Sequence, residues 1–204
     1  MVKKFLHIGC GQNRKDSTTD FFNTSDWDEV RLDIDPSVNP DIVSSIQDMS
    51  VIDSDTFDAV YSSHNIEHIH SFDVHKTFSE INRVLNNDGF LILTCPDLKA
   101  VCSLIADGKI LDKLYDSPSG PIYPLDIISG HQKSLFLGKN FMAHKNGFTV
   151  ESITAFMQSS NFMSFIVGEA VGSLALWSIA YKNKVVSTED LTIELKKHIR
   201  IKKS

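Results

Sequence analysis

The sequence predicts an α/β fold: a seven-stranded, mostly parallel sheet with helices on both faces and an antiparallel hairpin near the C-terminus. Short apolar runs alternate with polar or helical segments along the first hundred residues. About twenty residues separate the first two runs, which is enough for a crossover between parallel strands. Two further β-prone runs lie close together in the C-terminal part, which is typical of a hairpin.

The expected strands are short runs of β-branched, aromatic and other apolar residues. They cover residues 5–8, 30–34, 41–43, 57–62, 90–94, 164–167 and 174–181. The clearest helix begins near Val74, because apolar side chains recur at helical spacing as far as Leu85. Further helices are predicted over residues 98–105 and, with Thr149 as the N-cap, as far as Phe162. Polar residues after the first strand disfavour a long helix, so the first crossover is expected to be abbreviated.

The length of 204 residues suits one domain, expected over residues 1–183, with a basic helical tail at 184–204. The tail is interpreted either as a solvated amphipathic helix or as a segment that steers toward an anionic partner. Residues 97–148 are expected to form a lid or acceptor-recognition insertion. After the predicted helix at 98–105, the stretch to Lys133 holds several prolines and glycines and is expected to be irregular. Four aromatic side chains in this insertion are candidates for an apolar pocket wall or for the core: Tyr115, Tyr123, Phe136 and Phe141.

Composition argues against several classes of protein. No apolar run is long enough to cross a bilayer, and no targeting signal is visible, so membrane insertion is not expected. The net charge of −6 argues against nucleic-acid binding. The three cysteines are interpreted as free thiols, which favours a cytoplasmic location. The oligomeric state stays open, with a homodimer among the options.

The most informative residues follow the first two predicted strands. Gly9 and Gly11 flank Cys10, and glycine permits a positive φ and a close approach of the backbone to a ligand. Asp33 ends the second strand, where a carboxylate could accept hydrogen bonds from both hydroxyls of a ribose. Ligands of open parallel sheets bind at this edge. Arg14 stands where a dinucleotide fingerprint needs a third glycine, which weighs against a nicotinamide site.

These and later motifs resemble the class I (Rossmann-like) S-adenosylmethionine-dependent methyltransferases, in their type 11-like small-molecule branch, over about residues 4–96. Residues 6–11 resemble the first motif of the family, and residues 32–36 resemble the second. Residues 57–69 resemble the fourth-strand motif with its terminal Glu-His pair, and residues 81–91 resemble the helix and strand that follow.

The resemblance implies S-adenosyl-L-methionine as the cofactor. By that resemblance Gly9 and Gly11 line the methionine portion, Asp33 binds the ribose, and Asp48 binds the adenine amino group. His7 stands where the family more often has an acidic residue, although a neutral imidazole could still accept a hydrogen bond. The full set of implied cofactor-binding residues is His7, Gly9, Cys10, Gly11, Asp33, Ile34, Asp48, Met49, Ser63 and His64.

Methyl transfer requires mainly that donor and acceptor be held in line, so a general base is needed only for a protonated acceptor. The candidates for that base are His64, by its place in the motif, and the loop residues His131 and His144. A metal site is not expected, because Glu67 and His68 are adjacent and would point to different sides of a helix.

The expected activity is therefore methyl transfer to an oxygen or nitrogen of a small or carrier-borne acceptor. One alternative is a non-catalytic S-adenosylmethionine-binding module that acts through partners. A nicotinamide-dependent oxidoreductase is a further alternative.

Overall fold

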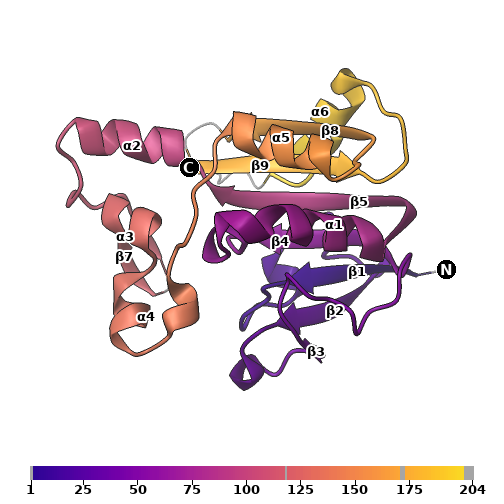
Figure 1. The fold of residues 1–204 in the computed structure, drawn as a ribbon, viewed down its shortest axis with the longest axis horizontal. Coiled ribbons are helices and arrows are strands. Elements are labelled where there is room, and N and C mark those ends of the chain that lie inside the picture. The colour runs from indigo at the N-terminus through magenta and orange to yellow at the C-terminus, as the bar shows by residue number, and fades with distance from the viewer. Residues whose placement is uncertain (1, 118, 171–172, 200–204) are drawn as a thin grey trace.

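The computed structural model describes residues 2–117, 119–170 and 173–199, and its centre is a twisted sheet in the order β3-β2-β1-β4-β5-β9-β8 (Figure 1). Strands β1 to β5 of this sheet run parallel, and β9 pairs antiparallel with both β5 and β8. The predicted α/β fold with an antiparallel C-terminal hairpin is confirmed. The strands of the sheet are β1 (Lys3–Ile8), β2 (Trp27–Asp33), β3 (Ile42–Val43), β4 (Phe57–Ser63), β5 (Leu85–Pro96), β8 (Ser164–Glu169) and β9 (Ala175–Tyr181).

Helices occur near the predicted positions, and several further short ones occur between them. Thr149 caps α5 as expected, since its hydroxyl accepts a hydrogen bond from the Ser152 amide. Among the described residues, every helix is too short or too polar to cross a bilayer. The α-helices are α1 (Val74–Val84), α2 (Leu98–Ala106), α3 (Pro124–Ser129), α4 (Gln132–Phe136), α5 (Val150–Ser159) and α6 (Thr188–Lys196).

Alternation of side chains along β1 divides the core into two layers. Leu6 and Ile8 belong to the layer that packs under α1 and α5, together with Phe78 of α1 and Met157 of α5. Phe5 belongs to the opposite layer. Both faces of the sheet are therefore closed by apolar packing.

The second face is covered in an unusual way, because the first crossover contains only a 3-10 turn, Lys15–Ser17, in place of a full helix. The expected abbreviation of this crossover is confirmed. Phe22 from the crossover and Leu191 and Leu195 from α6 are buried in one cluster with Phe5. The C-terminal segment thus helps to close this face of the sheet, with α6 packed against β8 and β9. Residues 200–204 of the predicted tail lie outside the described residues.

His198 anchors this C-terminal segment inside the aromatic cluster. Its ring packs against Phe21, Phe22 and Phe90, and its Nδ1 lies 3.2 Å from the hydroxyl of Thr19. Burial lowers the pKa of His198 to about 4. The imidazole is therefore neutral in the folded protein at pH values where it is protonated in the unfolded chain.

This burial predicts a loss of stability on acidification. As the pH falls from about 6.5, the ordinary pKa of histidine, toward 4, the unfolded chain binds a proton that the folded protein does not. The free energy of unfolding should fall by up to about 3 kcal/mol from this group. In His198→Gln, which can keep a hydrogen bond to Thr19, urea unfolding across this range should show a shallower pH slope. His75→Gln on the surface is the control, and equal slopes in wild type and His198→Gln would contradict the assignment.

Residues 97–148 form a lobe beside the sheet (Figure 1). The helix predicted at 98–105 is present as α2, but the stretch that follows it consists of short regular elements, so the expectation of a long irregular stretch as far as Lys133 is wrong. The lobe contains α2, α3, α4 and a small hairpin, β6 (Tyr115–Ser117) with β7 (Gly120–Ile122). Asp126 joins α3 to α4, because its carboxylate accepts hydrogen bonds from the amides of Tyr123 and Gln132. Local hydrogen bonds of this kind, which composition alone does not reveal, order the segment.

Candidate active site

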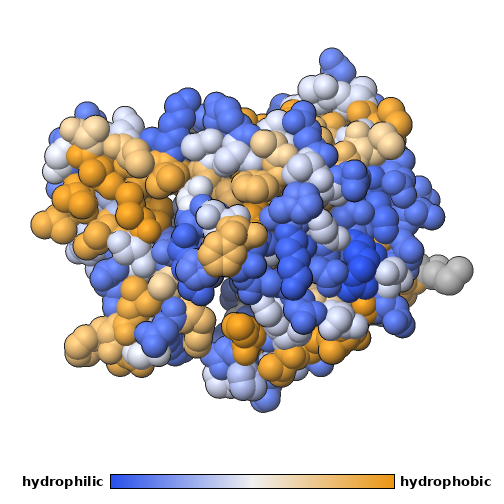
Figure 2. Space-filling view, in the orientation of Figure 1, coloured by the Kyte–Doolittle hydropathy of each residue, from blue (hydrophilic) through white to orange (hydrophobic). Residues whose placement is uncertain are grey.

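A pocket of about 540 Å³ lies at the carboxyl ends of β1, β2 and β4, which is where ligands of open α/β sheets bind. The strand ends contribute Gly9, Gly11, Asp33, Ser63 and His64. Figure 2 shows the molecular surface hollowed between the sheet and the lobe. The lobe contributes Ser119, Ser134, Lys139, Phe141, Met142 and Lys145 to the lining.

The turn after β1 requires glycine. Gly9 has a φ of +63°, and a Cβ at this position would lie 2.0 Å from Nδ2 of Asn65. Gly11 has a φ of +52°, and a Cβ there would meet no atom within 4 Å. Both glycines line the pocket, so the backbone itself forms this wall and a ligand can approach it closely.

Asp33 is held in one orientation by backbone amides. One carboxylate oxygen accepts a hydrogen bond of 2.8 Å from the Gly11 amide, and the other accepts one of 2.9 Å from the Asp35 amide. Each oxygen keeps a lone pair for a further donor, as binding of the two ribose hydroxyls requires. Ile34 beside it lines the pocket with 56% of its surface exposed, which gives an apolar face to a flat ring.

Arg31 is a structural residue of the site that the sequence reasoning missed. Its buried guanidinium donates hydrogen bonds to the carbonyls of Gly11 and Asn13 in one loop and of Asn39 in the next. It therefore holds together the two loops that follow β1 and β2. The available signal was a lone charged residue between the apolar Val30 and Leu32 of a predicted strand, since a buried charge needs partners.

Cys10 lines the pocket, but its thiol is not expected to act as a nucleophile near pH 7. Burial raises the pKa of its thiol to about 11, and the nearby Arg31 offsets only part of this effect. The thiol is therefore protonated near pH 7, and Cys10 contributes to the site as part of the pocket wall.

Among the three candidate bases, His64 alone lines the pocket, with 51% of its side chain exposed. Its Nδ1 lies 3.5 Å from Oε1 of Glu67. Partial desolvation of the ring opposes protonation of His64, but the Glu67 carboxylate outweighs this effect and raises the pKa of His64. His131 and His144 are engaged elsewhere: Nδ1 of His131 lies 2.8 Å from the Ser134 hydroxyl, and Nδ1 of His144 lies 2.7 Å from the Ile127 carbonyl.

Seven of the predicted cofactor residues line the pocket: Gly9, Cys10, Gly11, Asp33, Ile34, Ser63 and His64. The other three lie outside its lining. His7 is buried under the sheet with its Nδ1 2.7 Å from Oε1 of Glu29, because its position in β1 points to the face opposite Leu6. Asp48 accepts a hydrogen bond from the Ser50 amide, and Met49 is buried in the core.

Residues that follow β3 take the place of Asp48 and Met49 in the pocket wall. Ser45, Ile46 and Gln47 line it directly after this two-residue strand. The rule that strand ends bind ligands, applied to residues 41–43, would have found them. Of the four aromatic candidates in the lobe, Phe141 lines the pocket.

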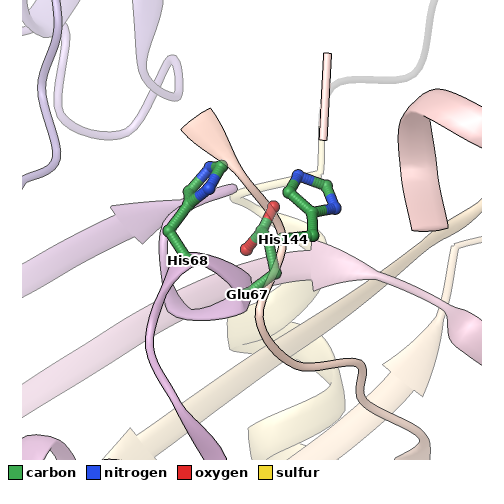
Figure 3. A group of neighbouring side chains, drawn as sticks. All are labelled: Glu67, His68 and His144. Atoms are coloured by element: carbon green, nitrogen blue, oxygen red, sulfur yellow. The ribbon is translucent and has the colours of Figure 1, made fainter. Parts of the chain in front are cut away.

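Glu67 and His68 were expected to point to different sides of a helix, and this expectation is wrong. The segment is a single 3-10 turn, Ile66–His68, and the donor atoms of Glu67, His68 and His144 lie within 4.8 Å of one another. Figure 3 shows the Glu67 carboxylate between the two imidazole rings.

Comparison with known proteins agrees with this geometry. A family profile described as a methyltransferase domain matches residues 6–93. Residues 6–93 therefore resemble a methyltransferase domain. The motif resemblance expected from the sequence is thereby confirmed, and the match supports the expected cofactor, S-adenosyl-L-methionine, and the expected enzyme class.

Several solved structures share the fold of this chain. A SAM-dependent methyltransferase from Archaeoglobus fulgidus is 13% identical with a TM-score of 0.58, and the match covers 88% of this chain and 86% of that one. A Burkholderia thailandensis 1,6-didemethyltoxoflavin-N1-methyltransferase with bound S-adenosylhomocysteine is 13% identical with a TM-score of 0.54, covering 89% and 72%.

A possible exported protein from Bordetella parapertussis is 14% identical with a TM-score of 0.59, and the match covers 90% of this chain but 62% of that one. The chain therefore spans less than two thirds of that relative. A comparison with curated protein sequences finds no match.

The residues of the pocket fit this cofactor. The pocket wall at Gly9 and Gly11 is bare backbone, and the space beside Gly11 is open, which suits the close approach of the methionine portion. The amide-oriented carboxylate of Asp33 suits a ribose, and the exposed side chain of Ile34 suits an adenine face. The pocket volume lies in the range of cofactor sites.

Asp33→Ala is expected to weaken binding of S-adenosylhomocysteine at least about tenfold, because it removes two charge-assisted hydrogen bonds to the ribose. Isothermal titration calorimetry measures the change. Asp88→Ala, on the surface and outside the pocket lining, is the control and should bind as wild type does. An unchanged affinity in Asp33→Ala would mean that the ribose contact is misassigned.

Proposed function

We propose that the chain transfers a methyl group from S-adenosyl-L-methionine to an oxygen or nitrogen atom of a small or carrier-borne acceptor. The observation that carries this proposal is the shared pocket. One cavity is lined both by the strand-end residues suited to the cofactor and by side chains of the lobe, such as Lys139, Phe141 and Lys145. An acceptor held by the lobe would therefore face the cofactor directly.

When bound, the cofactor supplies an electrophilic methyl group together with its own leaving group. Gly9 and Gly11 would hold the methionine portion, and Asp33 would fix the ribose, so the methyl group would point toward Ser63 and His64. The lobe would close the other side, exclude water and orient the acceptor in line with the donor. His64 is the one candidate base in the pocket lining, and it would accept a proton from a protonated acceptor.

The two alternatives receive less support than the methyltransferase. His7 was one reason to consider a non-catalytic module. It lies outside the pocket lining and is buried against the sheet. A nicotinamide site needs a pyrophosphate at a helix N-terminus after β1, but this crossover holds only the turn Lys15–Ser17.

Transfer of labelled methyl groups tests the proposal. The purified protein is incubated with methyl-labelled S-adenosylmethionine and a cell extract. A whole extract offers both small-molecule and carrier-borne acceptors, and a desalted extract offers only the carrier-borne ones. Label is measured in the small-molecule and macromolecule fractions. We expect label in a small-molecule or carrier fraction, with strong reduction in Asp33→Ala. Cofactor binding without any transfer would contradict the proposal and favour the non-catalytic module.

A cytoplasmic location and a homodimer also remain proposals. Cys10, Cys95 and Cys102 are all free thiols, which supports a reducing compartment. Sedimentation of the purified protein tests the oligomeric state.

A further inference from the structure

A compact group of metal-ligating side chains lies next to the pocket, here called the Glu67 cluster: Glu67, His68 and His144. Glu67 and His68 come from the 3-10 turn after β4, and His144 comes from the end of the lobe. One donor atom from each residue lies within 4.8 Å of the others. In Figure 3 the two imidazole rings flank the carboxylate of Glu67.

Both histidines are fixed in the tautomer that a metal ligand needs. Nδ1 of His68 lies 3.1 Å from the carbonyl oxygen of Ala143, and Nδ1 of His144 lies 2.7 Å from that of Ile127. A carbonyl oxygen only accepts hydrogen bonds, so each Nδ1 carries the proton and each Nε2 offers a lone pair when the ring is neutral. Metal-binding histidines commonly donate their second ring N–H in this way.

The carboxylate of Glu67 is placed where a cation would satisfy it. Its residue is 1% exposed, and within the part of the chain that the structure describes neither of its oxygens has a hydrogen-bond partner. The nearest positively charged candidate is Nδ1 of His64 at 3.5 Å. Burial of a carboxylate that has no hydrogen bond and one ion-pair partner at 3.5 Å is costly, so such a group calls for a closer, specific partner.

The backbone holds the two halves of the cluster together. The amides of Lys145 and Asn146 donate hydrogen bonds of 2.8 and 3.2 Å to the carbonyl of Glu67. These bonds place His144 beside the turn that carries Glu67 and His68. The ligand set is therefore positioned by the fold before any ion binds.

We propose that the Glu67 cluster binds one divalent transition-metal ion of the Zn²⁺ type through a Glu67 oxygen and Nε2 of His68 and His144. Two imidazoles and one carboxylate are a ligand set that holds such ions and leaves coordination positions open. Ligand atoms at about 2.1 Å from one ion are at most about 4.2 Å apart, so the cluster must contract by a fraction of an ångström. Small rotations of the three side chains accomplish this contraction.

The position of this ion in the pocket wall would let it contact the acceptor. His68 belongs both to the cluster and to the lining of the pocket, so the ion would lie in the pocket wall. An open coordination position there could hold an oxygen atom of the acceptor and lower its pKa. Metal binding itself does not depend on the proposed methyl transfer and is measured without donor or acceptor.

The test is calorimetric titration of chelator-treated, dialysed protein with ZnCl₂. We expect one equivalent of Zn²⁺ to bind, with at least about tenfold weaker affinity in Glu67→Gln and in His144→Asn. His75→Asn, which removes an exposed histidine of α1, should bind as wild type does. Thermal unfolding without metal shows which variants are folded. If His144→Asn does not fold, the comparison of Glu67→Gln with wild type is the test.

A second readout is the melting temperature, which Zn²⁺ should raise in wild type and in His75→Asn but not in Glu67→Gln. The proposal is overturned if no stoichiometric binding occurs. It is also overturned if Zn²⁺ binds equally well to wild type and Glu67→Gln, because the ion would then be held by surface histidines.

Discussion

Gly9→Ala is expected to weaken binding of S-adenosylhomocysteine at least about thirtyfold, or about 2 kcal/mol. Two effects act at this position: backbone strain lowers the stability of the fold, and displacement of Asn65 lowers the affinity for the ligand. The φ of +63° is disfavoured for alanine by about 1 kcal/mol, and the new Cβ would lie 2.0 Å from Nδ2 of Asn65. Asn65 also lines the pocket, so its displacement changes the wall that faces the cofactor. Calorimetric titration measures the affinity.

Gly108→Ala is the control that separates the effect of backbone strain from the effect of displacing Asn65. Gly108 also has a positive φ, +81°, but a Cβ there meets no atom within 4 Å, and the residue lies outside the pocket lining. This control should lose about 1 kcal/mol of stability and keep its affinity. If Gly9→Ala binds the ligand as wild type does, the turn after β1 is not the cofactor cradle.

Arg31→Met is expected to lower the free energy of unfolding by about 3 kcal/mol and to weaken cofactor binding as well. The substitution keeps much of the buried volume but leaves the carbonyls of Gly11, Asn13 and Asn39 without their donor. The loops after β1 and β2 then lose their shared anchor. Urea unfolding and calorimetry measure the two effects separately.

Arg14→Met is the matched control for this arginine. Arg14 is exposed and lies outside the pocket lining, so its replacement should change the free energy of unfolding by less than about 0.5 kcal/mol. Arg31→Lys should recover part of the loss at most, because one ammonium group cannot span carbonyls in two loops. Stability of Arg31→Met equal to that of wild type would contradict this account.

The strand ends of the first half of the chain were predictable because their signals are local. An apolar run that stops at Gly9, or at Asp33, marks both the end of a strand and the place of a ligand. Since parallel strands share one direction, residues after different strands meet at one edge of the sheet. Gly9, Gly11 and Asp33, predicted from these strand ends, all line the pocket, as does Ser63, which the family resemblance implied.

What the sequence did not reveal depends on contacts between distant segments. His144 reaches Glu67 only because the lobe returns to the sheet, where backbone hydrogen bonds join the two segments. The packing of His198 against Phe21 and Phe22 likewise depends on a first crossover too short to fill its face of the sheet. Neither pairing leaves a periodic or compositional signal in the chain.

Calorimetric titration of the wild-type protein with S-adenosylhomocysteine, and separately with NAD, tests the central assignment most directly. The geometry of the pocket predicts saturable binding of S-adenosylhomocysteine, weakened in Asp33→Ala, and no heat with NAD. Saturable binding of NAD with no heat from S-adenosylhomocysteine would contradict the assignment of a methyltransferase site.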